Sequence, residues 1–191
     1  MQGACDSPLT EQGIHQAQEA QKILKDVPFK KAYCSTSERT RDTADIILEG
    51  RDVPVEYTKG LKEIDFGDYE GLVFDEHKEE ILKIRSTDND WTGVHGENLE
   101  MLKKRLVSTY QKIIGESEDG DKILIVSHGA VFMQYFPLLF DIAITDFFGN
   151  IRGPQPVPNG YVGTFEYKDG KFYLSSYRSD SELVSKLYHR D

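Results

Sequence analysis

One stretch decides the fold: Lys122-Ile123-Leu124-Ile125-Val126-Ser127-His128-Gly129. Residues 123–126 are all apolar, so both faces of a strand built from them would be buried. Such a pattern is typical of a strand in the middle of a parallel sheet that helices cover on both faces. Ser127, His128 and Gly129 follow at the carboxyl end of this strand, where open α/β sheets bind their ligands. The stretch therefore predicts a sheet and the edge at which a site is expected.

Helix and strand patterns alternate along the rest of the chain. Apolar residues at helical spacing predict helices over 10–25, 38–48, 72–85 and 97–114. Short apolar runs predict strands over 32–34 and 53–57, and residues 161–174 have the alternation of a hairpin around Asp169-Gly170. Alternating strands and helices indicate an α/β fold in three layers, with a mostly parallel open sheet flanked by helices on both faces.

Length and charge limit the class of protein. The 191 residues fit a single domain, 1–191, in which residues 72–97 are expected to form a small insert on the substrate side. A net charge of −10 argues against nucleic acid or an anionic membrane as the main partner. The apolar stretch 130–148 is interrupted by Pro137, Asp141 and Asp146, which argues against a membrane span.

Cysteine and ligand spacing bear on location and cofactors. Cys5 and Cys34 form no disulfide framework, which indicates free thiols in a reducing compartment and predicts a cytoplasmic protein. The His, Cys and acidic residues do not share metal-ligand spacing, so we expect no metal and no cofactor.

His128 is the first candidate for chemistry, because it follows the buried strand directly and a helix is expected behind it. Gly129 would allow a ligand to approach the backbone closely, and the N–H groups of Gly129 and Ala130 would face an anion from the start of that helix. A histidine at a strand end is, taken alone, equally consistent with a packed or capping side chain.

Arg39 is the second candidate. It belongs to the run Ser35-Thr36-Ser37-Glu38-Arg39, which follows the strand predicted at 32–34. From there its guanidinium can reach back over the same sheet edge and offer two parallel donors to a phosphate or a carboxylate. Arg41 should face elsewhere on the same helix, toward solvent.

The loop 61–71 is the third candidate, because it carries four carboxylates between apolar residues and glycines. A carboxyl that acts as a general acid must stay protonated near neutral pH, and burial against the aromatic residues of the loop, Phe66 or Tyr69, would favour this. We expect Asp65 and Asp68 to be solvated charges.

These motifs together resemble the phosphoglycerate-mutase-like enzymes of the histidine phosphatase superfamily. The resemblance covers nearly the whole chain in the family's order, which is far more specific than any single motif. It rests on the following segments: 2–13 for the phosphate loop and first helix, Cys34-Ser35 with Arg39 and Thr43-Ala44 for the arginine motif, Leu61 and Glu63 with Phe66-Gly67 and Glu70-Gly71 for the acid motif, Gly96-Glu97, Ser127-His128-Gly129 for the second histidine motif, and Asn159-Gly160.

The resemblance implies a mechanism. A neutral histidine attacks a phosphomonoester, a phosphohistidine forms, and water or another hydroxyl then takes the phosphoryl group. Arg39 and His128 would hold the phosphate oxygens, and Glu63 would give its proton to the leaving group and then activate water. Gln2 and Gly3 would bind substrate as part of the phosphate loop, together with Gly129 and Ala130.

The sequence departs from the family at its start. The family's nucleophile lies in an Arg-His-Gly motif at the end of a first strand, upstream of the segment that matches Gln2-Gly3. We therefore expect the first strand and the nucleophilic histidine to be missing from this chain, which should then be N-terminally truncated and inactive by this mechanism. His15, His77, His95 and His189 offer no convincing replacement, although His95 could line a substrate pocket. Alternatively, the fold rearranges or borrows a strand from a second chain, as in a homodimer.

Three functions remain under consideration. A phosphatase that acts on a small phosphorylated substrate is favoured over a phosphoglycerate mutase, because the stretch between Gly71 and Gly96 is short for an insert that retains the phosphoryl group. The alternative from another class is a non-catalytic phospho-ligand-binding protein that kept Arg39 and His128. An ordinary α/β domain with coincidental motifs is disfavoured by their order.

Overall fold

The computed structural model describes residues 1–142 and 159–178. Its strands form two sheets. The parallel sheet contains β1 (Lys31–Ser35), β2 (Val55–Thr58) and β3 (Ile123–Val126) in the order β2-β1-β3. The second sheet is an antiparallel hairpin of β4 (Val162–Lys168) and β5 (Lys171–Arg178).

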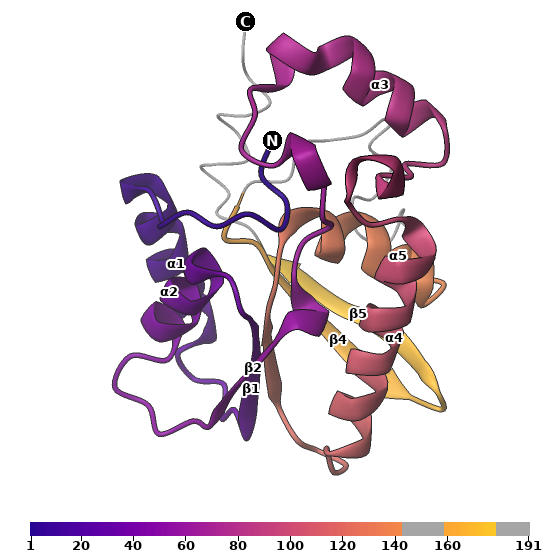
Figure 1. Ribbon diagram of the computed structural model, residues 1–191. Coiled ribbons are helices and arrows are strands. Elements are labelled where there is room, and N and C mark those ends of the chain that lie inside the picture. The colour runs from indigo at the N-terminus through magenta and orange to yellow at the C-terminus, as the bar shows by residue number, and fades with distance from the viewer. Residues whose placement is uncertain (143–158, 179–191) are drawn as a thin grey trace, which may run out of the picture.

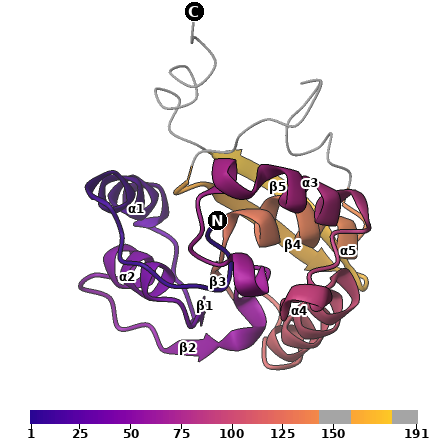
Figure 2. The same cartoon turned by 45° about the horizontal axis from the view of Figure 1, so that its top comes forward.

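Helices cover the parallel sheet on both faces, as Figures 1 and 2 show. One layer is formed by α1 (Glu11–Leu24) and α2 (Glu38–Ile47), and the opposite layer by α4 (Leu99–Gly115) and α5 (Phe136–Leu139). The helix α3 (Lys78–Ser86) lies beyond the carboxyl ends of the strands, above the first residues of the chain. This arrangement is the α/β fold with a parallel sheet and flanking helices that the sequence predicts.

Short helical turns connect these elements. The turn η5 (Val131–Tyr135) is a π-type turn that leads from Gly129 into α5. The described residues also contain four 3-10 turns: η1 (Lys59–Leu61), η2 (Gly67–Tyr69), η3 (Phe74–His77) and η4 (Thr92–Val94).

Side-chain caps explain where α1 and α4 begin. The Thr10 hydroxyl accepts a hydrogen bond from Gly13 N at the start of α1, as the sequence predicts. The side chain of Asn98 accepts from Met101 N, so α4 begins at Leu99 rather than at Glu97. Over the predicted helix 72–85, η3 precedes α3, and the α-helix begins only at Lys78.

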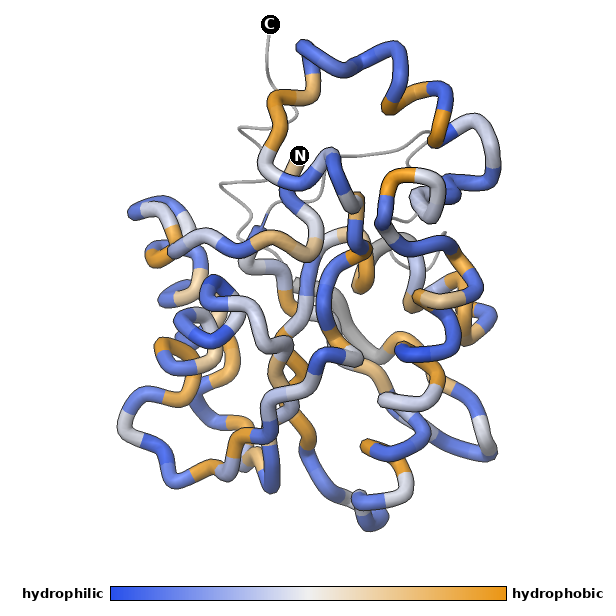
Figure 3. Tube along the Cα trace, in the orientation of Figure 1, coloured by the Kyte–Doolittle hydropathy of each residue, from blue (hydrophilic) through white to orange (hydrophobic). Residues whose placement is uncertain are grey.

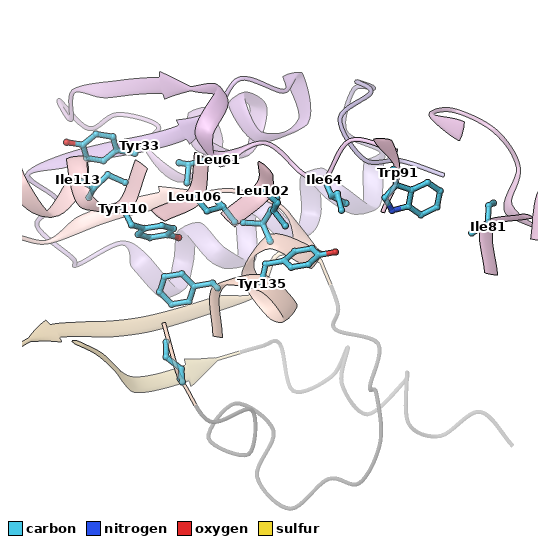
Figure 4. Close-up of a cluster of buried hydrophobic side chains, with 13 residues drawn as sticks. Tyr33, Leu61, Ile64, Ile81, Trp91, Leu102, Leu106, Tyr110, Ile113 and Tyr135 are labelled. Atoms are coloured by element: carbon cyan, nitrogen blue, oxygen red, sulfur yellow. The ribbon is translucent and has the colours of Figure 1, made fainter. Parts of the chain in front are cut away.

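Two clusters of buried side chains hold the layers together. The smaller cluster joins α1 and α2 to β1 and β3 through residues such as Ala20, Ala32 and Ala44. The larger cluster extends as a row from Tyr33 to Trp91 and Ile81, so the 72–97 segment contributes its far end (Figure 4). Hydrophobic and hydrophilic residues alternate along the helices (Figure 3), so each helix turns an apolar side toward these clusters.

The position of β3 differs from the expectation. Its apolar sequence predicts a strand in the middle of the sheet, but among the described residues β3 pairs only with β1, and β1 occupies the middle. The second edge of β3 faces a cavity that separates it from β4. Burial by helices on both faces accounts for the apolar residues of β3 without a second neighbouring strand.

The described residues contain no helix that is long and apolar enough to cross a membrane. Residues 143–148 of the apolar stretch 130–148 and residue His189 lie outside the described ranges.

Core packing by α4 gives a stability test. Replacing the fully buried Leu106 by Ala removes methyl groups from the larger cluster, and we expect a loss of about 2–5 kcal/mol in the free energy of unfolding. Met101→Ala on the same helix is the control, because the Met101 side chain is 51% exposed, and it should cost less than about 1 kcal/mol. Urea unfolding monitored by circular dichroism measures both, and equal losses would contradict this account of the core.

Candidate functional site

His128 lies at the carboxyl end of β3 and is only 6% exposed. Its Nδ1 is 2.9 Å from Nη2 of Arg39, and its Nε2 is 2.8 Å from Oγ of Ser35. An arginine nitrogen can only donate, so Nδ1 accepts from Arg39, and a neutral ring carries its proton on Nε2, which donates to Ser35. The two contacts therefore fix both the orientation and the tautomer of the ring.

Burial also sets the charge of this ring. Desolvation, followed by the positive charges of Arg39, Arg105 and Lys62, lowers the pKa of His128 to about 3. His128 is therefore neutral at neutral pH in the structure described.

Arg39 connects this ring to the first residues of the chain. Its Nη1 donates to the carbonyl of Cys5 at 2.8 Å and its Nη2 to the carbonyl of Gly3 at 2.9 Å. The Asp6 carboxylate lies 3.7 Å from Nη1. The arginine therefore lies between the 3–6 segment and the end of β3, at the edge predicted from the sequence.

Glu63 is the buried carboxyl of the acid loop, with 7% of its surface exposed. Its Oε2 accepts from Ala130 N at 2.9 Å, and its Oε1 accepts from Ile64 N at 3.0 Å. Desolvation raises the pKa of Glu63, against the opposing effect of these two hydrogen bonds and of the Arg39 charge. A raised pKa favours the protonated form that a general acid needs.

The predicted substrate-binding residues have other partners in the structure. Ala130 N, which is predicted to face an anion, donates to the buried carboxyl of Glu63 in the structure. Gly3 N donates to Glu70, and Gln2 Nε2 donates to the Ser7 hydroxyl. A Cβ atom added at Gly129 would meet no atom within 4 Å, which agrees with close access for a ligand there.

Glu70 belongs to the acid motif, but the sequence did not predict its role in the structure. Its carboxylate accepts from the main-chain N–H groups of Gly3, Ala4, Cys5 and Phe66, at 2.7 to 3.1 Å. Burial acts to raise its pKa, but hydrogen bonds from the Cys5 side chain and from main-chain N–H groups prevail, and the pKa of Glu70 is lowered. Glu70 thus holds the 3–5 segment in the place where Arg39 contacts it.

Arg105 and Glu97 form a second support that was not predicted. Two guanidinium nitrogens of Arg105 lie 2.7 and 2.8 Å from the Glu97 carboxylate oxygens. The same guanidinium donates to the carbonyls of Gly60, Lys62 and Glu63 at 2.7 to 3.1 Å. It therefore fixes the backbone of the acid loop. This role of Arg105 could have been suspected from the sequence, because the arginine lies between Leu102 and Leu106 within the apolar stripe of the helix.

The remaining candidates lie away from this cluster. His95 is exposed and its Nδ1 lies 3.0 Å from an oxygen of Asp68, so it does not face Arg39 or His128 in the structure. Arg41 lies over the Tyr57 ring at 4.9 Å, away from the site, as expected.

Asp65 accepts a hydrogen bond from Gly67 N at 2.8 Å, so it caps a turn and is not the solvated charge that the sequence predicts. In the ranges 1–142 and 159–178, no group of three or more His, Cys, Asp or Glu residues could hold a metal ion.

Three comparisons relate this geometry to known proteins. The chain is 35% identical over 133 residues to the adenosylcobalamin/alpha-ribazole phosphatase of Salmonella typhimurium, which covers 68% of this chain and 65% of that protein. It is 30% identical over 182 residues to the uncharacterized phosphatase PhoE of Bacillus subtilis, with 95% of this chain and 87% of the relative covered. The crystal structure of a putative alpha-ribazole-5'-P phosphatase from Escherichia coli superposes with a TM-score of 0.75 at 28% identity, covering 93% of this chain and 87% of that one.

The chain thus spans less than two thirds of the length of the Salmonella relative, but most of the Bacillus one. The family description that matches is the histidine phosphatase superfamily (branch 1), over residues 1–180. That match, with Arg39, Glu63 and His128 gathered around one edge of the sheet, places this chain in the histidine phosphatase superfamily.

Proposed function

We propose that this chain provides the phosphate-binding and proton-donating groups of a phosphomonoester hydrolase that acts through a phosphohistidine. The contact of 2.9 Å between Arg39 and His128 at the end of β3 is the observation that carries this proposal. The phosphatases among its relatives support hydrolysis rather than transfer between hydroxyls. The short stretch between Gly71 and Gly96 also supports a phosphatase over a mutase. The two free cysteines favour a cytoplasmic location.

Arg39 would bind a phosphate group through the N–H donors of its planar guanidinium. Its guanidinium donates to two carbonyl oxygens, and a phosphate dianion is a stronger acceptor than a carbonyl. The anion would therefore replace one of these partners without leaving a donor unpaired.

His128 would change its charge when the anion binds. Burial, together with the positive groups around the ring, keeps the pKa of His128 low, and the two negative charges of a phosphate beside the ring would raise that pKa. The ring would then take up a proton at Nδ1, which would stop accepting from Arg39, and Nδ1 and Arg39 would each donate a hydrogen bond to a phosphate oxygen. Charge that develops on the phosphoryl group in the transition state is stabilised by the same donors.

Glu63 would donate its proton to the leaving oxygen and later remove a proton from water. Its burial and raised pKa suit the first step, and Arg105 fixes the backbone from which it extends.

The nucleophile is the part that this chain does not place at the site. No Arg-His-Gly motif occurs in the 191 residues. Of the histidines that the structure describes, only His128 contacts Arg39, and its Nε2 is bonded to Ser35. We therefore expect the chain alone to bind phosphate without turning it over.

Anion binding by Arg39 can be measured directly. Titration calorimetry with sulfate, which does not change its charge near neutral pH, should show binding to the unmodified chain, and Arg39→Ala should weaken it by at least about tenfold through loss of charged hydrogen bonds. Arg41→Ala is the matched control, since Arg41 is on the same helix and lies over Tyr57. Equal binding by the two variants would show that the anion binds elsewhere.

The proton uptake by His128 predicts a pH dependence. The pKa of the free state is about 3, so sulfate affinity should rise as the pH falls through the higher pKa of the bound state, by at most about tenfold per pH unit. The His128→Asn variant cannot take up a proton at this position. Its sulfate affinity should therefore depend less on pH between about pH 8 and about pH 5, the range in which a histidine commonly titrates. Calorimetry in buffers of different ionisation enthalpy counts the protons, and an unchanged slope in the variant would refute this role.

Chemical rescue tests the hydrolytic reaction itself. With p-nitrophenyl phosphate, added imidazole should attack phosphorus through its nitrogen, the p-nitrophenol oxygen should leave with the Glu63 proton, and water should then hydrolyse the N-phosphoimidazole. We expect the unmodified chain to release p-nitrophenol only when imidazole is present. The His128→Ala and Arg39→Ala variants should lose this imidazole-dependent release. Sulfate binding without rescue would favour the non-catalytic binder. Hydrolysis that survives both substitutions would show that the proposed pocket is wrong.

A further inference from the structure

The Asp6 carboxylate lies at the start of α2, although it belongs to the 3–6 segment. Figure 1 shows this segment in indigo, between the N-terminus and α1. Oδ2 of Asp6 accepts a hydrogen bond of 2.7 Å from Glu38 N, at the first residue of α2. Oδ1 accepts from Ser7 N at 3.1 Å. Main-chain donors therefore hold both oxygens, so this negative charge has a fixed position in the structure.

The start of α2 explains why a carboxylate lies there. Ser37 precedes the helix, but its side chain makes no cap hydrogen bond, and its buried hydroxyl has no partner among the described residues. The first N–H groups of a helix need acceptors, and the positive end of the helix dipole favours a negative charge. Asp6 supplies both from 32 positions away in the sequence.

The same carboxylate lies beside the guanidinium that we propose to bind phosphate. Oδ1 of Asp6 is 3.7 Å from Nη1 of Arg39, and this Nη1 donates to the carbonyl of Cys5. The distance of 3.7 Å is too long for a hydrogen bond. Asp6 therefore acts on Arg39 through its charge and does not occupy one of its N–H donors.

The charge of Asp6 also reaches His128. Burial and three positive side chains lower the pKa of His128, and the Asp6 carboxylate acts in the opposite direction. Both side chains that would hold a phosphate are therefore within electrostatic reach of Asp6. An anion bound between them would lie near this fixed negative charge, and like charges repel each other.

We propose that Asp6 limits the affinity of the site for phosphate and is thus a positioning residue that acts through Arg39 and His128. The repulsion applies to a bound phosphomonoester and to inorganic phosphate alike, so it weakens the binding of both and favours release of the product. This inference rests on the proposed binding of phosphate by Arg39. It gives Asp6 a second role besides the cap of α2, and the two roles predict opposite effects on anion binding when Asp6 is replaced.

The Asp6→Asn variant tests this role in the full chain, because the amide keeps an oxygen that can accept from Glu38 N but has no charge. We expect it to bind sulfate about three- to tenfold more tightly than the unmodified chain in titration calorimetry at about pH 8. Solvent screens part of the repulsion, since the Asp6 side chain is 43% exposed, so the gain is modest. Inorganic phosphate should show a similar gain.

The Glu11→Gln variant is the matched control. Glu11 is an exposed acidic residue in the first turn of α1, and its replacement removes the same charge from the chain. Among the described residues it forms no ion pair with Arg39, so this variant should bind sulfate within about twofold of the unmodified chain.

The protonation of His128 provides an independent measurement. In the sulfate complex of Asp6→Asn, nitrogen-15 NMR should detect the charged His128 ring only at a lower pH than in the complex of the unmodified chain, because one negative charge that stabilises this ring is gone. A role in capping alone would leave this titration unchanged. If circular dichroism shows that Asp6→Asn does not fold, Asp6→Ser serves in its place, because a serine hydroxyl can also accept from a helix N–H.

The outcomes separate this inference from the proposed function. Equal or weaker sulfate binding by the folded uncharged variant would overturn the role of Asp6 and leave anion binding by Arg39 in place. An unchanged NMR titration of His128 would also overturn it. If neither the variant nor the unmodified chain binds sulfate, the proposed function fails, and this inference fails with it.

Discussion

The hydrogen bond of 2.9 Å from Arg39 to Nδ1 of His128 joins positions 89 residues apart in the sequence. It exists because β1 and β3 are parallel neighbours, so the segments after their carboxyl ends meet at one edge. Arg39 enters from α2 after β1, and His128 follows β3 directly. The site therefore depends on the pairing of two strands and not on any single loop.

The cost of burying these groups is offset by a shell of polar contacts. The Arg39 charge is surrounded by the carbonyls of Gly3 and Cys5 and by the Asp6 carboxylate. Glu70 holds the segment that provides those carbonyls, through main-chain N–H groups. Such a network is stable when each of its donors finds an acceptor, and that requirement orders the first residues of the chain around the site.

A similar support holds the acid. Arg105 spans the Glu97 carboxylate and the carbonyls of the acid loop, so the position of Glu63 is set from α4, across the larger cluster from β3. His128 and Glu63 are both desolvated, yet burial acts in opposite directions on their pKa values, because it disfavours the charged form of each. The site thus contains an imidazole that is neutral in the free chain and a carboxyl whose raised pKa favours its protonated form.

Much of this arrangement could be predicted from the sequence. Apolar runs located β1 and β3, helical spacing located α1 and α4, and the rule for parallel sheets brought Arg39 and His128 to one edge. The contact between Ser35 and His128, and the bond between Ala130 and Glu63, could not be predicted, because they depend on rotamers and on neighbours far apart in the sequence. The edge position of β3 could not be predicted for a related reason. Apolar residues in a strand indicate that its two faces are buried, but they do not indicate whether other strands pair with its two edges.

The charge state of His128 tests the central claim most directly. Nitrogen-15 NMR of the imidazole ring distinguishes the two neutral tautomers from the charged ring. The account predicts a neutral ring with its proton on Nε2 at neutral pH in the free chain, and a charged ring after sulfate is added. A ring that is already charged in the free chain, or one that sulfate leaves unchanged, would contradict it.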